Sequence, residues 1–186
     1  NLGVLPKGFI EKETPEGVIL ENKEIGVSFK VPKNWEFIGY LDNFIDLKSP
    51  DYKSDNKSFK RIRGCLIRVS VFHRSYSNLI DEVNRIKNGF IHPENKEIIK
   101  ISGYDTLKTT EQNKRLLEEG IKESIIIEIP LPETRIKFLT YIFQEEEEKC
   151  TEAFNKFLET VSIDYIFDEA ETWSKREDFI IEENIG

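Results

Sequence analysis

The clearest pattern in the chain is the alternation of apolar and polar side chains in the segment IGVSFKV, residues 25–31. A period of two places its apolar residues on one face, as in a half-buried β-strand. Because Pro32 has no backbone N–H to donate, the strand is predicted to end there. The segment RIKFLTYIF is apolar on both faces, which is typical of a central strand. Strands are also predicted in residues 43–50, 65–72, 96–101, 104–110, 123–129 and 135–143.

Two segments change to the three- and four-residue spacing of an amphipathic helix. The first begins after Ser77 or Asn78, either of which could cap it, and ends before Gly89, a residue favoured beyond helix C-termini. The second follows the acidic run QEEEEK at residues 144–149. Such a run suits a helix N-terminus and lacks the ligand spacing of a calcium loop. The apolar stripe of this second helix consists of Cys150, Ala153, Phe154, Phe157, Leu158 and Val161.

The order of these elements predicts one α+β domain, in which helices cover a mostly antiparallel sheet. Residues 1–17 contain glycine, proline and charges without periodicity, so we expect a linker or tether there. The domain itself is predicted to span residues 18–163. Residues 164–186 keep some aromatic side chains but no clear period, and are interpreted as a C-terminal extension.

Several motifs make the chain resemble the PsbP-like family over residues 18–163. They are the segment GVSFKVPKNW at residues 26–35, the sequence LKSPD at residues 47–51, the strand and helix of residues 65–89, the segment ISGYDTLKTT, and the closing strand and helix of residues 135–161. The resemblance implies an α/β/α sandwich, shared with a Ran-binding nuclear import factor and with bacterial lipoproteins. It also implies a binding or assembly role without chemistry. In this reading, the Trp35 ring folds back and closes one end of the core.

Composition and charge narrow the classes of partner. Charged residues make up 33% of the chain, and no run approaches the roughly 18 apolar residues of a membrane span. A net charge of −8 would repel phosphate backbones, so nucleic acid is not the expected partner. The chain starts at Asn1 and contains no methionine, so we expect that upstream residues were removed. Export to the cell envelope, with or without an upstream lipid anchor, is the expected localisation, and a cytoplasmic one stays open.

Cys65 and Cys150 are the two cysteines, and their spacing matches neither a disulfide scaffold nor a metal or redox motif. Both fall on predicted apolar faces. We therefore expect two buried free thiols that pack as small apolar groups. A disulfide is the alternative if the last helix crosses the strand that begins at Cys65, because bridging needs the two Cα atoms within about 7 Å.

Candidate catalytic chemistry is sparse. No nucleophile motif or phosphate-binding glycine loop occurs, so no cofactor is expected. His73 and His92, with Glu94 nearby, are the residues that a metal-assisted hydrolase could use, but a zinc site normally needs three or four protein ligands. A small-molecule carrier with an apolar cavity between sheet and helix is a further alternative. The leading hypothesis remains a non-enzymatic binding or assembly module with a protein partner.

One segment has a charge opposite to the rest of the chain. Residues 51–63 form a polar stretch that predicts a long exposed loop, and its basic residues are offset by only two aspartates. A local positive field on an acidic chain can orient an acidic partner, although a solvated loop is the simpler interpretation. The candidate partner-binding residues are Lys53, Lys57, Lys60, Arg61 and Arg63.

Overall fold

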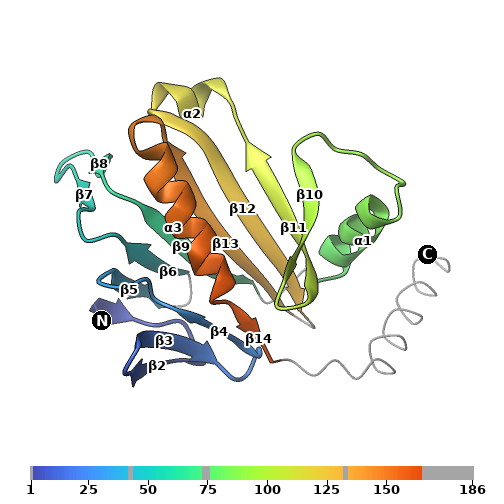
Figure 1. Cartoon of the computed structure of the whole chain (residues 1–186), viewed down its shortest axis with the longest axis horizontal. Helices are drawn as coiled ribbons and strands as arrows, with labels where there is room; N and C mark the ends of the chain where they lie inside the picture. Colours follow the sequence, from blue (N-terminus) through green and yellow to red (C-terminus); the bar gives the residue numbers. More distant parts are fainter. Residues whose placement is uncertain (1, 42–43, 73–75, 132–133, 165–186) are drawn as a thin grey trace.

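A computed structural model describes residues 2–41, 44–72, 76–131 and 134–164. It confirms the α+β class: a large, mostly antiparallel sheet carries helices, and no closed barrel forms. Figure 1 shows the sheet at the centre of the molecule. Its eight strands, in spatial order, are β1 (Leu2–Val4), β5 (Glu36–Tyr40), β6 (Phe44–Lys48), β9 (Leu66–Phe72), β13 (Thr134–Phe143), β12 (Ile121–Leu131), β11 (Tyr104–Glu111) and β10 (Lys96–Ile101).

All neighbouring pairs in this sheet are antiparallel except β1 and β5. The strand β13 lies between β9 and β12, so the prediction of a central strand for RIKFLTYIF is confirmed. A second sheet orders β14 (Ser162–Ile163), β4 (Val27–Lys30), β3 (Gly17–Asn22) and β2 (Phe9–Thr14). A separate hairpin pairs β7 (Lys53–Ser54) with β8 (Arg61–Arg63).

Two helices cover opposite faces of the large sheet. The helix α1 (Tyr76–Lys87) contacts β10, β11 and β12, where Ile98 packs with Leu79 and Val83. The neighbouring residue Ile99 packs into the main core instead, and adjacent residues of a strand point to opposite faces. The helix α3 (Glu147–Glu159) covers that other face, across β13 and β4 (Figure 1). A short α2 (Lys114–Glu118) and the 3₁₀ turn η1 (Gln144–Glu146) complete the helical elements of the described residues.

Phenylalanine rings fill the space between α3 and the strands beneath it. Phe157 lies 5.3 Å from Phe138 and 5.4 Å from Phe29, measured between ring centroids. Phe154 and Phe157 are each 1% exposed. The predicted apolar stripe of the second helix is therefore confirmed as its buried face. These rings fill the space between α3 and β13, where the carrier alternative placed an apolar cavity.

Two predictions about chain organisation need correction. The expected linker at residues 1–17 instead contributes β1 to the edge of the large sheet and β2 to the small one. Only Phe9 of β2 is buried, so the strand lacks the apolar alternation on which the prediction relied. The expected long loop at residues 51–63 contains the β7–β8 hairpin. The C-terminal extension, apart from Asp164, lies outside the described residues.

Candidate partner-binding hairpin and adjacent groove

The tip of the β7–β8 hairpin is a turn closed by Asp55. Its Oδ1 accepts hydrogen bonds from the backbone N–H groups of Ser58 at 2.7 Å and Lys57 at 2.9 Å. The two backbones also pair, through Asp55 N–H to the Lys60 carbonyl at 2.8 Å and Phe59 N–H to the Asp55 carbonyl at 2.9 Å. These bonds to Ser58 and Lys57 lower the pKa of the Asp55 carboxyl. The tip is therefore a hydrogen-bonded turn of defined shape.

This turn displays an aromatic side chain to solvent. Phe59 is 83% exposed and has a backbone φ of +57°, which is uncommon for a residue that is not glycine. Ile62, on the following strand, is 49% exposed. Phe59 and Ile62 together place two large apolar side chains on the exposed part of the hairpin. The sequence prediction missed Phe59, although a phenylalanine in a polar run was the available signal.

Four of the five predicted cationic residues are displayed by this hairpin: Lys57 and Lys60 lie in the turn with Phe59, and Lys53 pairs with Arg63 at the open end of the ladder. Lys53, Lys57, Lys60 and Arg63 are exposed, and none forms an ion pair with another described residue. Arg63 donates one hydrogen bond, from Nε to the Asp51 carbonyl at 3.2 Å. We call Lys53, Lys57, Phe59, Lys60, Ile62 and Arg63 the hairpin surface.

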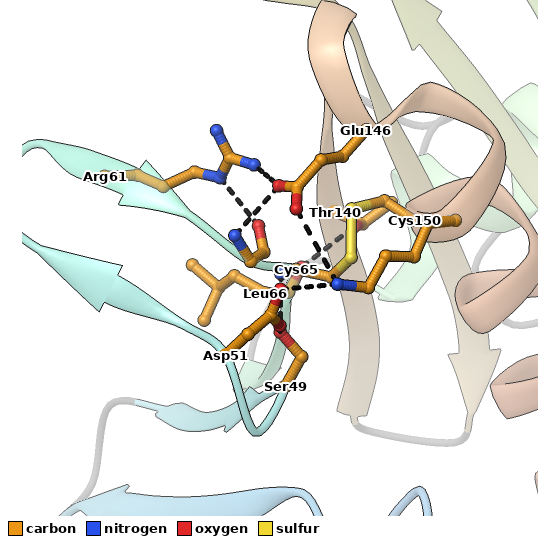
Figure 2. Close-up of a disulfide and its surroundings, with 10 residues drawn as sticks. Ser49, Asp51, Arg61, Cys65, Leu66, Thr140, Glu146 and Cys150 are labelled. Carbon is orange, nitrogen blue, oxygen red and sulfur yellow. Dashed lines mark hydrogen bonds and ion pairs between the residues drawn. A yellow bond between two sulfur atoms is a disulfide. The ribbon is translucent and has the colours of Figure 1, made fainter.

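The fifth predicted residue, Arg61, has a different role. Its guanidinium lies 3.4 Å from the centre of the Phe143 ring, forms an ion pair with Glu146, and donates from Nε to the Gly64 carbonyl at 2.6 Å. Its side chain is only 11% exposed, and this burial lowers its pKa. Arg61 pairs with Ser54 beside the turn, and its side chain reaches back to Gly64 and Glu146, so it holds the hairpin against the start of α3 (Figure 2).

A disulfide joins the base of the hairpin, where the chain leaves β8, to α3. Cys65 and Cys150 are bridged, with Cα atoms 5.4 Å apart and each residue 1% exposed. The prediction of burial is confirmed, and the prediction of free thiols is wrong. The alternative, a disulfide, is confirmed. It forms because α3 crosses the sheet where β9 begins, which places Cys150 next to Cys65 (Figure 2). The Gly64 N–H donates to Glu146 Oε2 at 2.8 Å, one helical turn from the disulfide.

Ser49 and Asp51 complete the fixed region on the other side of the hairpin. The Cys65 N–H donates to Ser49 Oγ at 2.8 Å, and this hydroxyl donates to Asp51 Oδ1 at 2.7 Å. Lys149 of α3 forms an ion pair with the same carboxylate. Lys149 first, and Ser49 second, lower the pKa of Asp51. The hairpin base is thus held by one covalent bond and a network of polar contacts.

A surface groove of about 1050 Å³ borders this base. One wall is α3, and the other is the turn VPKNW, in which the Trp35 N–H donates to the Pro32 carbonyl at 3.0 Å and Asn34 has a φ of +66°. A positive φ at the third turn position is the geometry that suits asparagine in a type II turn. Trp35 is half-buried: it packs against the core, as predicted, and also lines the groove.

The groove is rich in carboxylates. Seven acidic and four basic side chains line it, giving a negative balance. Most of them pair with each other or with nearby residues, as Lys30 does with Glu16 and Lys156 with Glu152. Glu145 and Glu148 are exposed and form no ion pair with any described residue. The acidic run at residues 144–149, predicted as a solvated helix start, therefore also forms one rim of the groove.

The histidine site of the hydrolase alternative gains no support. His73 lies outside the described residues, and His92 is exposed in the segment between α1 and β10. Within the described ranges, no three His, Cys, Asp or Glu side chains are grouped so that they could hold a metal ion. No helix in the same ranges has the length and apolar character needed to cross a membrane.

Comparisons with known proteins give a distant structural likeness. No family model matches the chain, and no curated protein does. A solved structure from Bacteroides thetaiotaomicron has a TM-score of 0.48 and 14% identity over 76% of this chain. The match spans 46% of that protein, so this chain corresponds to about half of its length. LpqN of Mycobacterium tuberculosis, involved in cell envelope biogenesis, has a TM-score of 0.45 and 12% identity over 75% of this chain and 83% of its own. At such TM-scores, the case for a function rests on the residues of this chain.

Proposed function

We propose that the chain is a non-enzymatic binding or assembly module of the cell envelope, and that its hairpin surface contacts an acidic partner protein. The observation that carries this proposal is the exposure of Phe59, at 83%, in a hydrogen-bonded turn among four cations without ion pairs. An aromatic residue can act as the anchor of an interface, and the cations can steer an acidic surface towards it. Because the base of the hairpin is fixed, little ordering entropy is lost on binding.

The disulfide supports the proposed location. Disulfides persist in oxidising compartments outside the cytoplasm, and Cys65–Cys150 is a buried structural bridge. The resemblance of residues 18–163 to the PsbP-like family, whose fold is shared with bacterial lipoproteins, favours the same location. The precursor is then expected to carry an export signal, with or without a lipid-modified cysteine, upstream of Asn1. Fractionation of cells that express the tagged precursor would locate it, and a purely cytoplasmic protein with reduced thiols would contradict this part of the proposal.

Charge reversal on the hairpin tests the binding surface. The test variant is Lys57→Glu/Lys60→Glu/Arg63→Glu, which leaves Arg61 unchanged because that residue holds the hairpin against the start of α3. The matched control is Lys7→Glu/Lys23→Glu/Lys114→Glu, three exposed lysines without ion pairs to described residues, which changes the net charge equally. Both variants should fold, as checked by circular dichroism, because each replaced side chain is exposed.

The full chain, immobilised, is exposed to an envelope extract of the source organism at about 0.15 M and about 1 M salt. Wild type and control should retain the same partner, and the hairpin variant should retain it at least about tenfold less. Higher salt should weaken the capture, because the Debye length falls from about 8 to about 3 Å and the charges are screened more strongly. Equal recovery by all three proteins would refute the hairpin as the binding surface.

A further inference from the structure

An acidic surface with the chemistry that the hairpin requires is present on this chain itself. We propose that the hairpin surface of one copy docks into the groove of a second copy, and that the second hairpin docks reciprocally into the first groove. This inference rests on the proposed function, because it uses the same hairpin surface and names its partner as a second copy. The module would then be a two-fold symmetric dimer.

Complementary charge is the first argument. The hairpin surface presents four cations that make no ion pair within the described residues, while the groove is lined by seven carboxylates and four ammonium groups. On the groove, Glu145 and Glu148 are the exposed carboxylates left over by the ion pairs of the described chain. They are placed to meet Lys57 and Lys60 of the other copy. Two chains of net charge −8 repel at long range, but the Debye length of about 8 Å leaves close pairs effective.

Complementary apolar surface is the second argument. Phe59 and Ile62 are exposed on the hairpin, and the groove offers Trp35, Pro32 and Ala153. A volume of about 1050 Å³ is comparable to the upper range of protein ligand pockets, so the groove can receive the side chains of a turn. Burial of Phe59 against Trp35 would supply the aromatic contact that often dominates an interface.

The positions of the hairpin surface and the groove favour reciprocal docking between two copies. The groove and the hairpin share a border, because Asp51 and Glu146 line the groove and also hold Arg63 and Arg61. Figure 1 shows the hairpin projecting from the side of the molecule, and the exposure of Phe59 means that it does not fill its own groove. When adjacent surfaces are complementary, a two-fold axis between them makes the same contact twice. Doubling helps the pair to approach the roughly 1,200–2,000 Å² that stable interfaces bury.

Sedimentation velocity of the full chain, over a range of concentrations at about 0.15 M salt, tests self-association. Wild type should show a monomer–dimer equilibrium. The hairpin variant Lys57→Glu/Lys60→Glu and the groove variant Glu145→Lys/Glu148→Lys should each dimerise at least about tenfold more weakly. The matched controls Lys23→Glu/Lys114→Glu and Glu118→Lys/Glu119→Lys should dimerise as wild type does.

Mixing the two reversed variants is the decisive step. Each alone places like charges in both contacts, whereas a mixed pair restores an attractive contact at both sites. An equimolar mixture should therefore form a heterodimer within about tenfold of the wild-type affinity. A mixture that stays monomeric while both variants are folded would refute the docking, as would a wild type that stays monomeric throughout.

The outcomes separate this inference from the function on which it rests. If wild type is monomeric but the hairpin still captures a foreign acidic protein, the dimer is wrong and the proposed function stands. If the hairpin variant matches wild type in both assays, both are wrong. Vesicles of phosphatidylglycerol, with phosphatidylcholine as control, form a further arm. Monomeric wild type that binds only the anionic vesicles through Phe59 and the lysines would replace both proposals with a lipid surface.

Discussion

The anchored and the exposed side chains of the β7–β8 hairpin use the same residue types in opposite ways. On the side that faces Glu146, Arg61 stacks on Phe143 and forms an ion pair, and its side chain is 11% exposed. At the tip, Phe59 is 83% exposed, and the lysines on either side form no ion pair with a described residue. The comparison teaches that the contacts of each residue divide a cationic segment: one arginine is held by stacking and an ion pair, while its neighbours stay exposed to solvent.

The same contrast applies to the aromatic side chains. Phe157 under α3 is 1% exposed and contacts other phenylalanine rings, whereas Phe59 contacts solvent. Burial of an aromatic side chain stabilises the fold by roughly 2–3 kcal/mol, and Phe59 forgoes most of this stabilisation. A phenylalanine displayed on a fixed turn therefore fits an intermolecular role better than a role in the fold.

Removing the disulfide should have the largest effect on the base. Cys65→Ser/Cys150→Ser opens a link between residues 85 positions apart, and loss of such a bridge typically costs about 2–5 kcal/mol. The midpoint of thermal unfolding should fall by roughly 5–20 °C for a chain of this size. Wild type treated with a reductant should approach the variant. Thiol titration of the unfolded, unreduced wild type should find no thiol, and two thiols would show that the bridge is absent.

A smaller difference is expected between Gly64, where the chain passes from the hairpin into β9, and a matched glycine elsewhere. Its φ is +94°, and an added Cβ would lie 2.4 Å from the Cα of Tyr52. Gly103 is the matched control, with a φ of +82° and no atom within 4 Å of an added Cβ. Gly103→Ala should lower the free energy of unfolding by about 1–2 kcal/mol. Gly64→Ala should lower it by about 1–3 kcal/mol more than Gly103→Ala does, because its Cβ also meets the backbone of Tyr52. If the two variants lose the same free energy of unfolding in denaturant, the backbone around Gly64 can move to accept the added Cβ.

The two arginines of β8 give the finest comparison. Arg61→Gln leaves Glu146 without its guanidinium partner and should lower stability by about 1–3 kcal/mol. Arg63→Gln removes an exposed side chain and should change stability by less than about 0.5 kcal/mol. Urea unfolding of the two variants measures the difference directly. A larger loss from Arg63→Gln than from Arg61→Gln would reverse the assignment of the anchored and the exposed arginine.

The sequence predicted the elements in which apolar and polar residues alternate with a clear period, and it did not predict those without one. The strands of residues 66–72, 96–101 and 104–111 and the stripe of α3 carry a clear period, and they were predicted in the correct places. The sequence did not predict β1, β2, β3, β5, β7, β8 and β14. In β2, five of six side chains are exposed or half-buried, so pairing with β3, and not burial of its own side chains, makes it a strand.

The site was less predictable because its contacts join distant residues. Nothing in residues 51–63 distinguishes Arg61 from Lys60, since the partner Glu146 lies 85 residues further on. The disulfide depends on where α3 crosses β9, which periodicity does not specify. The groove likewise combines the VPKNW turn with α3. Three sequence motifs used for the family resemblance meet there, at residues 31–35, 49–51 and 65, yet their proximity is a property of the tertiary fold.

The replacement Phe59→Ala tests the central claim, that the hairpin tip serves a partner and not the fold. Stability and dimerisation are measured on the same samples, with Phe90→Ala as the control, because Phe90 is 75% exposed and lies outside the hairpin and groove. The account predicts that both variants keep the wild-type unfolding free energy within about 0.5 kcal/mol, and that Phe59→Ala alone dimerises at least about tenfold more weakly. Unchanged dimerisation, or a stability loss of several kcal/mol in Phe59→Ala, would contradict it.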